Sequence, residues 1–178
     1  MNAKPSATEE LRTLGALLRA PFEALLDHVF DRLGKAGFDD VRPAHGAVLR
    51  NIAREGTRIT ELAERARMTK QSMAELIEFM RERHYLELVP DPTDGRAKLA
   101  RLTARGWKVH DTLVRSSREF EKDCARRMGR AKWRELRSLL EEFAAFSRSR
   151  SPAAPVTPAK ARKTSAAGRG NTPTQRVA

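Results

Sequence analysis

Two aspartates and an arginine stand close together in the segment DPTDGR, at Asp91, Asp94 and Arg96. A guanidinium on an exposed loop can enter the minor groove of DNA, which is narrow and strongly negative in A·T-rich sequence. A carboxylate two residues away can hydrogen-bond that guanidinium and orient it. The spacing of Asp94 and Arg96 therefore indicates a minor-groove probe. The simpler alternative is a solvated surface pair, worth under about 1 kcal/mol of stability.

Four polar residues, Thr69-Lys70-Gln71-Ser72, open a segment with helical spacing of its apolar residues. Lys can reach guanine O6 and N7, and Gln can pair with adenine N6 and N7 through two hydrogen bonds. Thr and Ser hydroxyls can contact phosphates or bases. These residues could read DNA from the start of a helix, or they could belong to an ordinary capped surface helix.

The elements around these residues decide between the interpretations. Residues 61–66 predict a short helix with Thr60 as its N-cap, and Met68-Thr69 opens a second helix that runs to about Arg83. The second helix carries an i, i+3, i+4, i+7 stripe of Met73, Leu76, Ile77 and Met80. The pair is a helix-turn-helix, whose second helix (the recognition helix) lies in the major groove with its first residues at the base edges.

A β-hairpin is predicted directly after the recognition helix. Two β-prone runs, Tyr85–Val89 and Lys98–Leu102, flank the charged segment, and Pro92 and Gly95 mark the turn. A helix-turn-helix followed by a hairpin is a winged helix, and the hairpin (the wing) can reach the adjacent minor groove. The candidate DNA-binding residues are therefore Thr69, Lys70, Gln71, Ser72, Asp94, Arg96 and Lys98.

Helices are also predicted before this core. The capping box Ser6-Ala7-Thr8-Glu9 begins the first of them, Pro21 is expected to kink or restart it, and Gly34 and Gly37 end it. Its apolar residues follow helical spacing at Leu11, Leu14, Leu18, Leu25, Val29 and Leu33. A further helix is expected over residues 43–54, because Pro43 suits a first helical turn.

Two more helices are predicted after the hairpin. Thr103 caps the first, Gly129 interrupts it, and the last helix runs to about Phe146. Their apolar stripes contain Trp107, His110, Leu113, Phe120, Cys124 and Met128, and then Trp133, Leu136, Leu140, Phe143 and Ala144. The stripes outside the winged core present more apolar surface than one small domain needs to bury. We therefore expect the flanking helices of two chains to pack together and form a dimer.

The charge of the chain favours a polyanionic partner, most simply nucleic acid. Its net charge is +12, with 35 Lys and Arg against 23 Asp and Glu. Residues 150–178 are rich in Ala, Pro, Ser, Thr and Gly and hold six of the basic residues and no acidic one, so they predict a disordered basic tail. Removing those six from the 35 leaves 29 basic against 23 acidic residues, still +6.

The sequence predicts a mainly α fold in four segments. A winged helix-turn-helix core with a small β-hairpin wing is flanked by long dimerisation helices. The segments are an N-terminal dimerisation helix (1–42), the DNA-binding domain (43–102), C-terminal dimerisation helices (103–149) and the tail (150–178).

The sequence resembles the bacterial MarR-type winged-helix regulators. The resemblance rests on ITELAERARMTKQSMAELIEFMRERHYLELVPDPTDGRAKLARLT, and the layout of the helices extends it to roughly residues 8–148. The wing resembles the family pattern Asp-x-Arg-Asp-x-Arg followed by a basic strand and Leu-Thr, and Asp91, Asp94, Arg96 and Leu102-Thr103 fall on it. Thr93 stands where the family often has arginine. His84 stands where the family usually ends the recognition helix with glycine, and His tolerates positive φ better than most residues.

The resemblance implies a homodimer in which the terminal helices of two chains intertwine. It also implies a small aromatic anion as effector, bound between the dimer helices and the DNA-binding core. His28 and His45 are weak candidates for such a crevice, and an ordinary half-buried histidine is the alternative for each.

Other chemistry finds little support in the sequence. Cys124 is the one cysteine; it lies on an apolar stripe, which favours a buried structural thiol over a redox sensor. The four histidines are too scattered for a metal motif, and no cofactor motif, nucleophile–base pair or paired-carboxylate spacing indicates an enzyme. No segment has the length of a membrane span, and a cytoplasmic, nucleoid-associated protein is expected.

The function expected from the sequence is a homodimeric, sequence-specific regulator of transcription that binds a pseudo-palindromic site in double-stranded DNA. Repression released by an effector is the expected mode of action. Two alternatives stay open, a nucleoid-associated architectural protein that uses the basic tail and a thiol-based redox sensor that uses Cys124.

Overall fold

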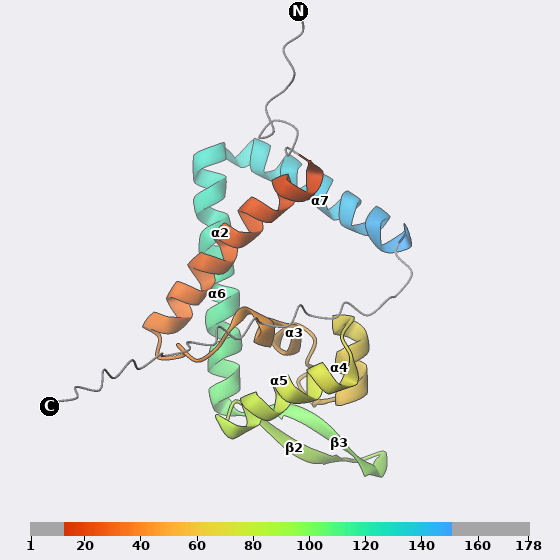
Figure 1. Cartoon of the computed structure of the whole chain (residues 1–178). Helices are drawn as coiled ribbons and strands as arrows, with labels where there is room; N and C mark the ends of the chain where they lie inside the picture. The colour runs from red at the N-terminus through yellow and green to blue at the C-terminus, as the bar shows by residue number, and fades with distance from the viewer. Residues whose placement is uncertain (1–12, 151–178) are drawn as a thin grey trace, which may run out of the picture.

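The computed structural model describes residues 13–150. Its elements are α2 (Leu14–Lys35), the 3-10 turn η1 (Pro43–His45), α3 (Gly46–Leu49), β1 (Thr57–Arg58), α4 (Ile59–Ala66), α5 (Lys70–Glu82), β2 (Leu86–Asp91), β3 (Asp94–Leu102), α6 (Ala104–Met128) and α7 (Arg130–Arg150). Figure 1 shows α4, α5 and the β2–β3 hairpin at one end of the molecule, with α6 leading from the hairpin to α7 at the other end. The fold is mainly α with a small antiparallel sheet, as the sequence predicted.

Threonine caps fix where the principal helices begin. The side chain of Thr69 accepts the N–H of Ser72 at 3.1 Å to start α5, and that of Thr103 accepts the N–H of Gly106 at 3.1 Å to start α6. Gly129, with a φ of +86°, separates α6 from α7. The predicted recognition helix, wing and C-terminal helices are therefore confirmed. The capping box at Ser6 and almost all of the predicted tail lie outside the described residues.

Two predicted boundaries were wrong, and of the two effects expected of Pro21, a kink or a restart, the restart does not occur. Thr60 is not the N-cap of α4, because Arg58 is extended in β1 and the helix begins at Ile59. Helix α2 continues through Pro21 without restarting; the surrounding turn is exposed, so water can satisfy the carbonyl that proline leaves free. The helix expected over 43–54 ends at Leu49, and the Ala53 N–H instead donates to the Thr57 side chain at 2.9 Å.

The sheet has three antiparallel strands in the order β1-β3-β2. Strand β2 pairs with β3 from Leu86 opposite Leu102 to Asp91 opposite Asp94. Strand β1, which the sequence did not predict, pairs Thr57 with Ala100 and Arg58 with Leu99. The central position of β3 ties the wing to the start of the helix-turn-helix, because β1 pairs with β3 near the base of the hairpin.

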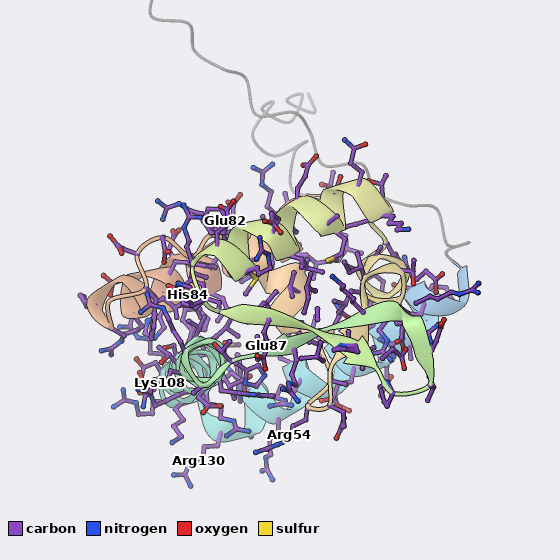
Figure 2. All side chains as sticks on the ribbon, turned by 90° about the horizontal axis from the view of Figure 1, so that it is seen from below. Arg54, Glu82, His84, Glu87, Lys108 and Arg130 are labelled. Carbon is purple, nitrogen blue, oxygen red and sulfur yellow. The ribbon has the colours of Figure 1, made fainter. Side chains whose placement is uncertain are left out.

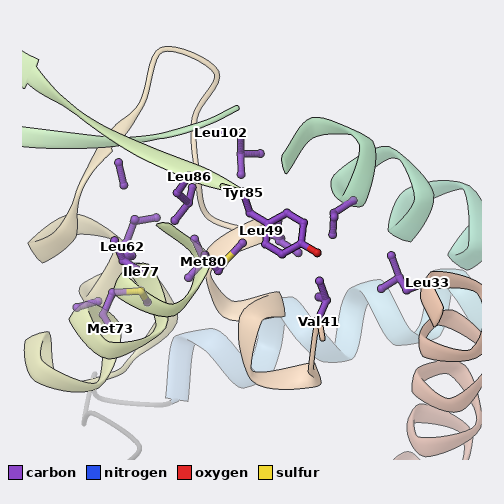
Figure 3. Packing of buried hydrophobic residues seen from close by; sticks show 14 of the residues in the cluster. Leu33, Val41, Leu49, Leu62, Met73, Ile77, Met80, Tyr85, Leu86 and Leu102 are labelled. Atoms are coloured by element: carbon purple, nitrogen blue, oxygen red, sulfur yellow. The ribbon is translucent and has the colours of Figure 1, made fainter. Parts of the chain in front are cut away.

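One hydrophobic core joins the winged region to α2 and α6 (Figure 3). The fully buried side chains come from all of these parts: Leu33, Val48, Leu62, Met73, Ile77, Met80, Tyr85 and Val109. The Tyr85 hydroxyl, at the edge of this core, donates to Asp40 at 2.7 Å and lies 3.1 Å from an Arg105 nitrogen. The recognition helix is thus seated by Met73, Ile77 and Met80, and its opposite face stays in solvent.

Two backbone positions show how closely the end of α5 meets α6. His84 has a φ of +58°, the left-handed conformation that glycine usually adopts after a helix, as its position in the family pattern suggested. Gly106 in the first turn of α6 is buried, and a Cβ added there would overlap the Tyr85 carbonyl oxygen. Only glycine lets α6 approach the start of β2 this closely.

Replacing Gly106 with alanine is therefore expected to destabilise the protein by about 1–3 kcal/mol or more, because the overlap is with backbone that cannot rotate away. Gly34→Ala is the matched control, since nothing lies within 4 Å of an added Cβ at that helical position. Urea unfolding followed by circular dichroism measures both. A Gly106→Ala variant as stable as Gly34→Ala would show that α6 does not pack as described.

Candidate nucleic-acid interface

The first turn of α5 presents two exposed polar side chains and two capping ones. Lys70 and Gln71 are exposed, whereas Thr69 and Ser72 are partly buried. The Thr69 hydroxyl also donates to the Ser72 hydroxyl at 2.9 Å, so the two side chains are occupied with each other. Lys70 and Gln71 remain the side chains best placed to contact a base, and a DNA role for all four residues stays a prediction.

The wing projects two cations on the side of the sheet that faces α5. Side chains alternate along a strand, so Arg96 and Lys98 share a face with buried Ala100. Lys98 lines a shallow groove between the hairpin and the last turns of α5, together with Glu78 and Glu82. Figure 2 shows Glu82 and His84 at that end of the helix and Glu87 on the neighbouring strand. Arg96 is exposed beyond the groove, near the tip.

The structure places the Asp94 carboxylate differently from the expectation. Asp94 Oδ1 accepts the backbone N–H of Arg96 at 3.1 Å, and Oδ2 lies 3.7 Å from an Arg58 nitrogen. Within residues 13–150 no hydrogen bond or ion pair joins the Asp94 carboxylate to the Arg96 guanidinium. The expected orienting pair is therefore not formed: Asp94 fixes the backbone from which Arg96 projects, and the cation nearest to its carboxylate is Arg58 of β1.

Asp91 anchors the entry of the wing loop, as the sequence suggested, and one of its partners is Arg58, which the sequence did not indicate. It is 6% exposed, and its Oδ1 accepts the Thr93 N–H at 2.8 Å and the Thr93 hydroxyl at 2.7 Å. Its Oδ2 accepts from Arg58 Nε at 2.6 Å. These hydrogen bonds, those from Thr93 first and then that from Arg58, lower the pKa of Asp91 to about 2. Thr93, the position at which this wing departs from the pattern it resembles, thus closes the loop on itself.

Asp91→Asn is expected to loosen the wing and to weaken DNA binding several-fold, because the neutral side chain loses the ion pair to Arg58. The native pKa is depressed, so the ionised carboxylate stabilises the fold above about pH 4. This contribution is lost as pH falls through about 2. The difference in melting temperature between wild type and Asp91→Asn should therefore be constant from pH 5 to 8 and should shrink at pH 3. A difference that stays constant down to pH 3 would contradict the ion pair.

The two histidines considered for an effector crevice lie in different surroundings. His45 is buried, its Nδ1 accepts the Arg42 N–H at 2.9 Å, and its ring stacks on Phe79 with centroids 4.3 Å apart. Burial lowers the pKa of His45, so it acts as a neutral cap of η1. His28 is half-buried against Phe120 and lines an open groove between α2 and α6.

Cys124 is partly buried on α6, which is less burial than the buried structural thiol expected from its apolar stripe. Among residues 13–150, no group of three or more His, Cys, Asp or Glu side chains is arranged to hold a metal ion. None of the helices in this part of the chain is long and apolar enough to cross a membrane.

Residues 39–97 match the sequence model described as MarR family. Wild-type MarR from E. coli, in its apo form, is 18% identical with a TM-score of 0.60, covering 74% of this chain and 96% of its own. Sco3205 from Streptomyces coelicolor, a MarR family transcriptional regulator in complex with DNA, is 21% identical with a TM-score of 0.56, covering 84% and 95%.

CouR from Rhodococcus jostii RHA1, bound to p-coumaroyl-CoA, is 21% identical with a TM-score of 0.58, covering 75% of this chain and 92% of its own. No curated protein matches the sequence. The matched segment contains the helix-turn-helix and most of the wing, and the solved structures share the arrangement of the helices around it. The resemblance drawn from the sequence is confirmed: residues 39–97 match the MarR family model, and the chain shares the winged helix-turn-helix fold of the solved MarR structures.

Proposed function

We propose that this chain is a transcriptional regulator that binds double-stranded DNA in a sequence-specific manner. One observation carries the proposal. Lys70 and Gln71 on α5 and Arg96 and Lys98 on the wing are all exposed, and the helix and the wing that present them pack on the same hydrophobic core. A helix inserted in the major groove would place the wing over the adjacent minor groove. Sco3205, which has this fold, was solved in complex with DNA.

The proposed regulator acts as a homodimer through the helices outside the winged core. In the described chain these helices leave large apolar side chains exposed: Leu14, Leu17, Leu18 and Phe22 on α2, Met128 on α6, and Leu139, Leu140, Phe143 and Phe146 on α7. A patch of this kind marks an interaction surface. A two-fold dimer would hold two recognition helices roughly 34–36 Å apart, one turn of DNA, over a pseudo-palindrome.

The proposed regulator releases DNA when an anionic effector binds to it. The groove beside His28 is lined by Arg32, Lys122, Arg126 and Arg130, with Glu119 and Asp123 between them. Arg32 and Arg126 pair with those carboxylates, which leaves Lys122 and Arg130 to attract an anion. CouR, with the same fold, was solved with p-coumaroyl-CoA bound. A repressor that loses DNA when such an anion binds fits these features.

Genome-wide mapping of bound sites tests the proposed function. The expected result is a small set of discrete sites that share a pseudo-palindromic motif, and the genes beside them would indicate the effector class. An architectural protein would instead coat DNA continuously, with its affinity set by charge alone. Broad occupancy without a shared motif would overturn the regulator in favour of that alternative.

A further inference from the structure

The recognition helix is acidic in a strongly basic protein. Helix α5, KQSMAELIEFMRE, carries Glu75, Glu78 and Glu82 against Lys70 and Arg81, whereas the whole chain has a net charge of +12. All five side chains are exposed, and Glu75, Glu78 and Glu82 follow Gln71 at the spacing of a single helix face, the face that would meet DNA. A carboxylate repels phosphates, so its presence there calls for a role other than general attraction.

Glu75 differs from the other two glutamates in its partners. Glu78 pairs with Arg81, and Glu82 lies 3.7 Å from an Arg83 nitrogen. No ion pair in the described part of the chain involves Glu75. Its Oε1 instead accepts from Gln71 Nε2 at 3.4 Å, one helical turn earlier, a long hydrogen bond between two exposed side chains.

This hydrogen bond leaves free the side-chain atoms of Gln71 and Glu75 that are needed to bind a base. The Gln71 amide has two N–H donors and one oxygen. With one N–H directed at Glu75, the other can donate to adenine N7 and the oxygen can accept from adenine N6. The second oxygen of Glu75 can accept from cytosine N4. Four residues of helix rise about 6 Å, so the two side chains reach base pairs one or two steps apart.

We propose that Gln71 and Glu75 act together as the base-reading pair of this protein, with adenine read by Gln71 and cytosine by Glu75. The inference rests on the proposed DNA-binding function and names the determinant of its specificity. The Glu75 carboxylate accepts hydrogen bonds and cannot donate them. It therefore favours the amino group of cytosine and rejects guanine O6 and N7 and thymine O4, which are acceptors. Adenine also offers an amino group, but its N7 acceptor lies beside that group and repels the second carboxylate oxygen.

The test compares the full chain with Glu75→Gln on operator variants carrying each of the four bases at every position. Wild type should prefer cytosine at one position in each half-site by roughly 5- to 150-fold. Glu75→Gln should lose most of that preference and should accept adenine, while binding unrelated DNA several-fold more tightly because a negative charge is gone. Glu64→Gln, an equal change of charge at an exposed position of α4, is the control and should keep the preference.

A second probe removes the donor from the DNA. N4-methylcytosine at the assigned position loses the N4 hydrogen that faces the major groove, so it should weaken wild type and leave Glu75→Gln nearly unaffected. Two results would refute the proposed base-reading pair: a wild-type affinity that the methyl group does not change, or a cytosine preference that survives in Glu75→Gln. Neither result would contradict the proposed function as a sequence-specific regulator. If wild type prefers no sequence at all, the proposed function itself fails together with the pair.

Discussion

Substituting aspartate for both Leu139 and Phe143 is expected to make the protein monomeric and to weaken its binding to a two-site operator by about 100-fold or more. These side chains lie one turn apart on α7 and are 57% and 38% exposed in the single chain. Charges there would not disturb the fold of the winged core, because neither side chain belongs to it. They would oppose burial of the apolar face against a second copy.

The size of this effect follows from the physical connection between the two DNA-binding domains of a dimer. Two winged domains joined in a dimer bind the second half-site as an intramolecular event, and losing that connection typically costs 10²–10⁴ in apparent affinity. Analytical ultracentrifugation measures the assembly and fluorescence anisotropy the affinity, with Ser138→Asp, an exposed polar position of α7, as control. A double variant that still sediments as a dimer would remove α7 from the interface.

Arg96→Ala is expected to weaken operator binding on the order of tenfold, most strongly where the flank is A·T-rich. The guanidinium is exposed near the wing tip, and the anchors at Asp91 and Asp94 hold the backbone that carries it. The loss comes from the narrow minor groove, where the negative potential attracts arginine. Lys108→Ala on α6 removes the same charge from a site away from the tip and should have little effect.

Asp94→Ala should act in the same direction but more mildly. It removes the hydrogen bond to the Arg96 N–H and the contact with Arg58, while the guanidinium itself remains. Both wing variants should melt near the wild-type temperature, since neither residue is buried. Wild-type operator affinity for Arg96→Ala at near-physiological salt would refute a wing that reaches DNA.

The architecture was predictable because its signals are local. The stripe of Met73, Ile77 and Met80, the threonine caps at Thr69 and Thr103 and the turn residues of the wing each act over a few positions. Even the left-handed conformation at His84 follows from its place in the family pattern. Local patterns of this kind give helices and hairpins directly.

What the sequence missed depends on contacts between distant segments. Strand β1 has two residues, too few to show alternation, and exists because β3 offers it a partner some 40 positions away. The ion pair of Arg58 with Asp91 joins residues 33 apart and assigns Asp91 to the wing anchor. The orienting role expected of Asp94 failed for the same reason, since its nearest cation comes from β1.

Hydroxyl-radical footprinting of the full-length protein on one mapped genomic site tests the central claim most directly. Two recognition helices and two wings predict two protected blocks about one helical turn apart, each flanked by a minor-groove protection that disappears in Arg96→Ala. Uniform protection without boundaries, or flanking protection that survives in Arg96→Ala, would contradict a dimeric, sequence-specific winged-helix regulator.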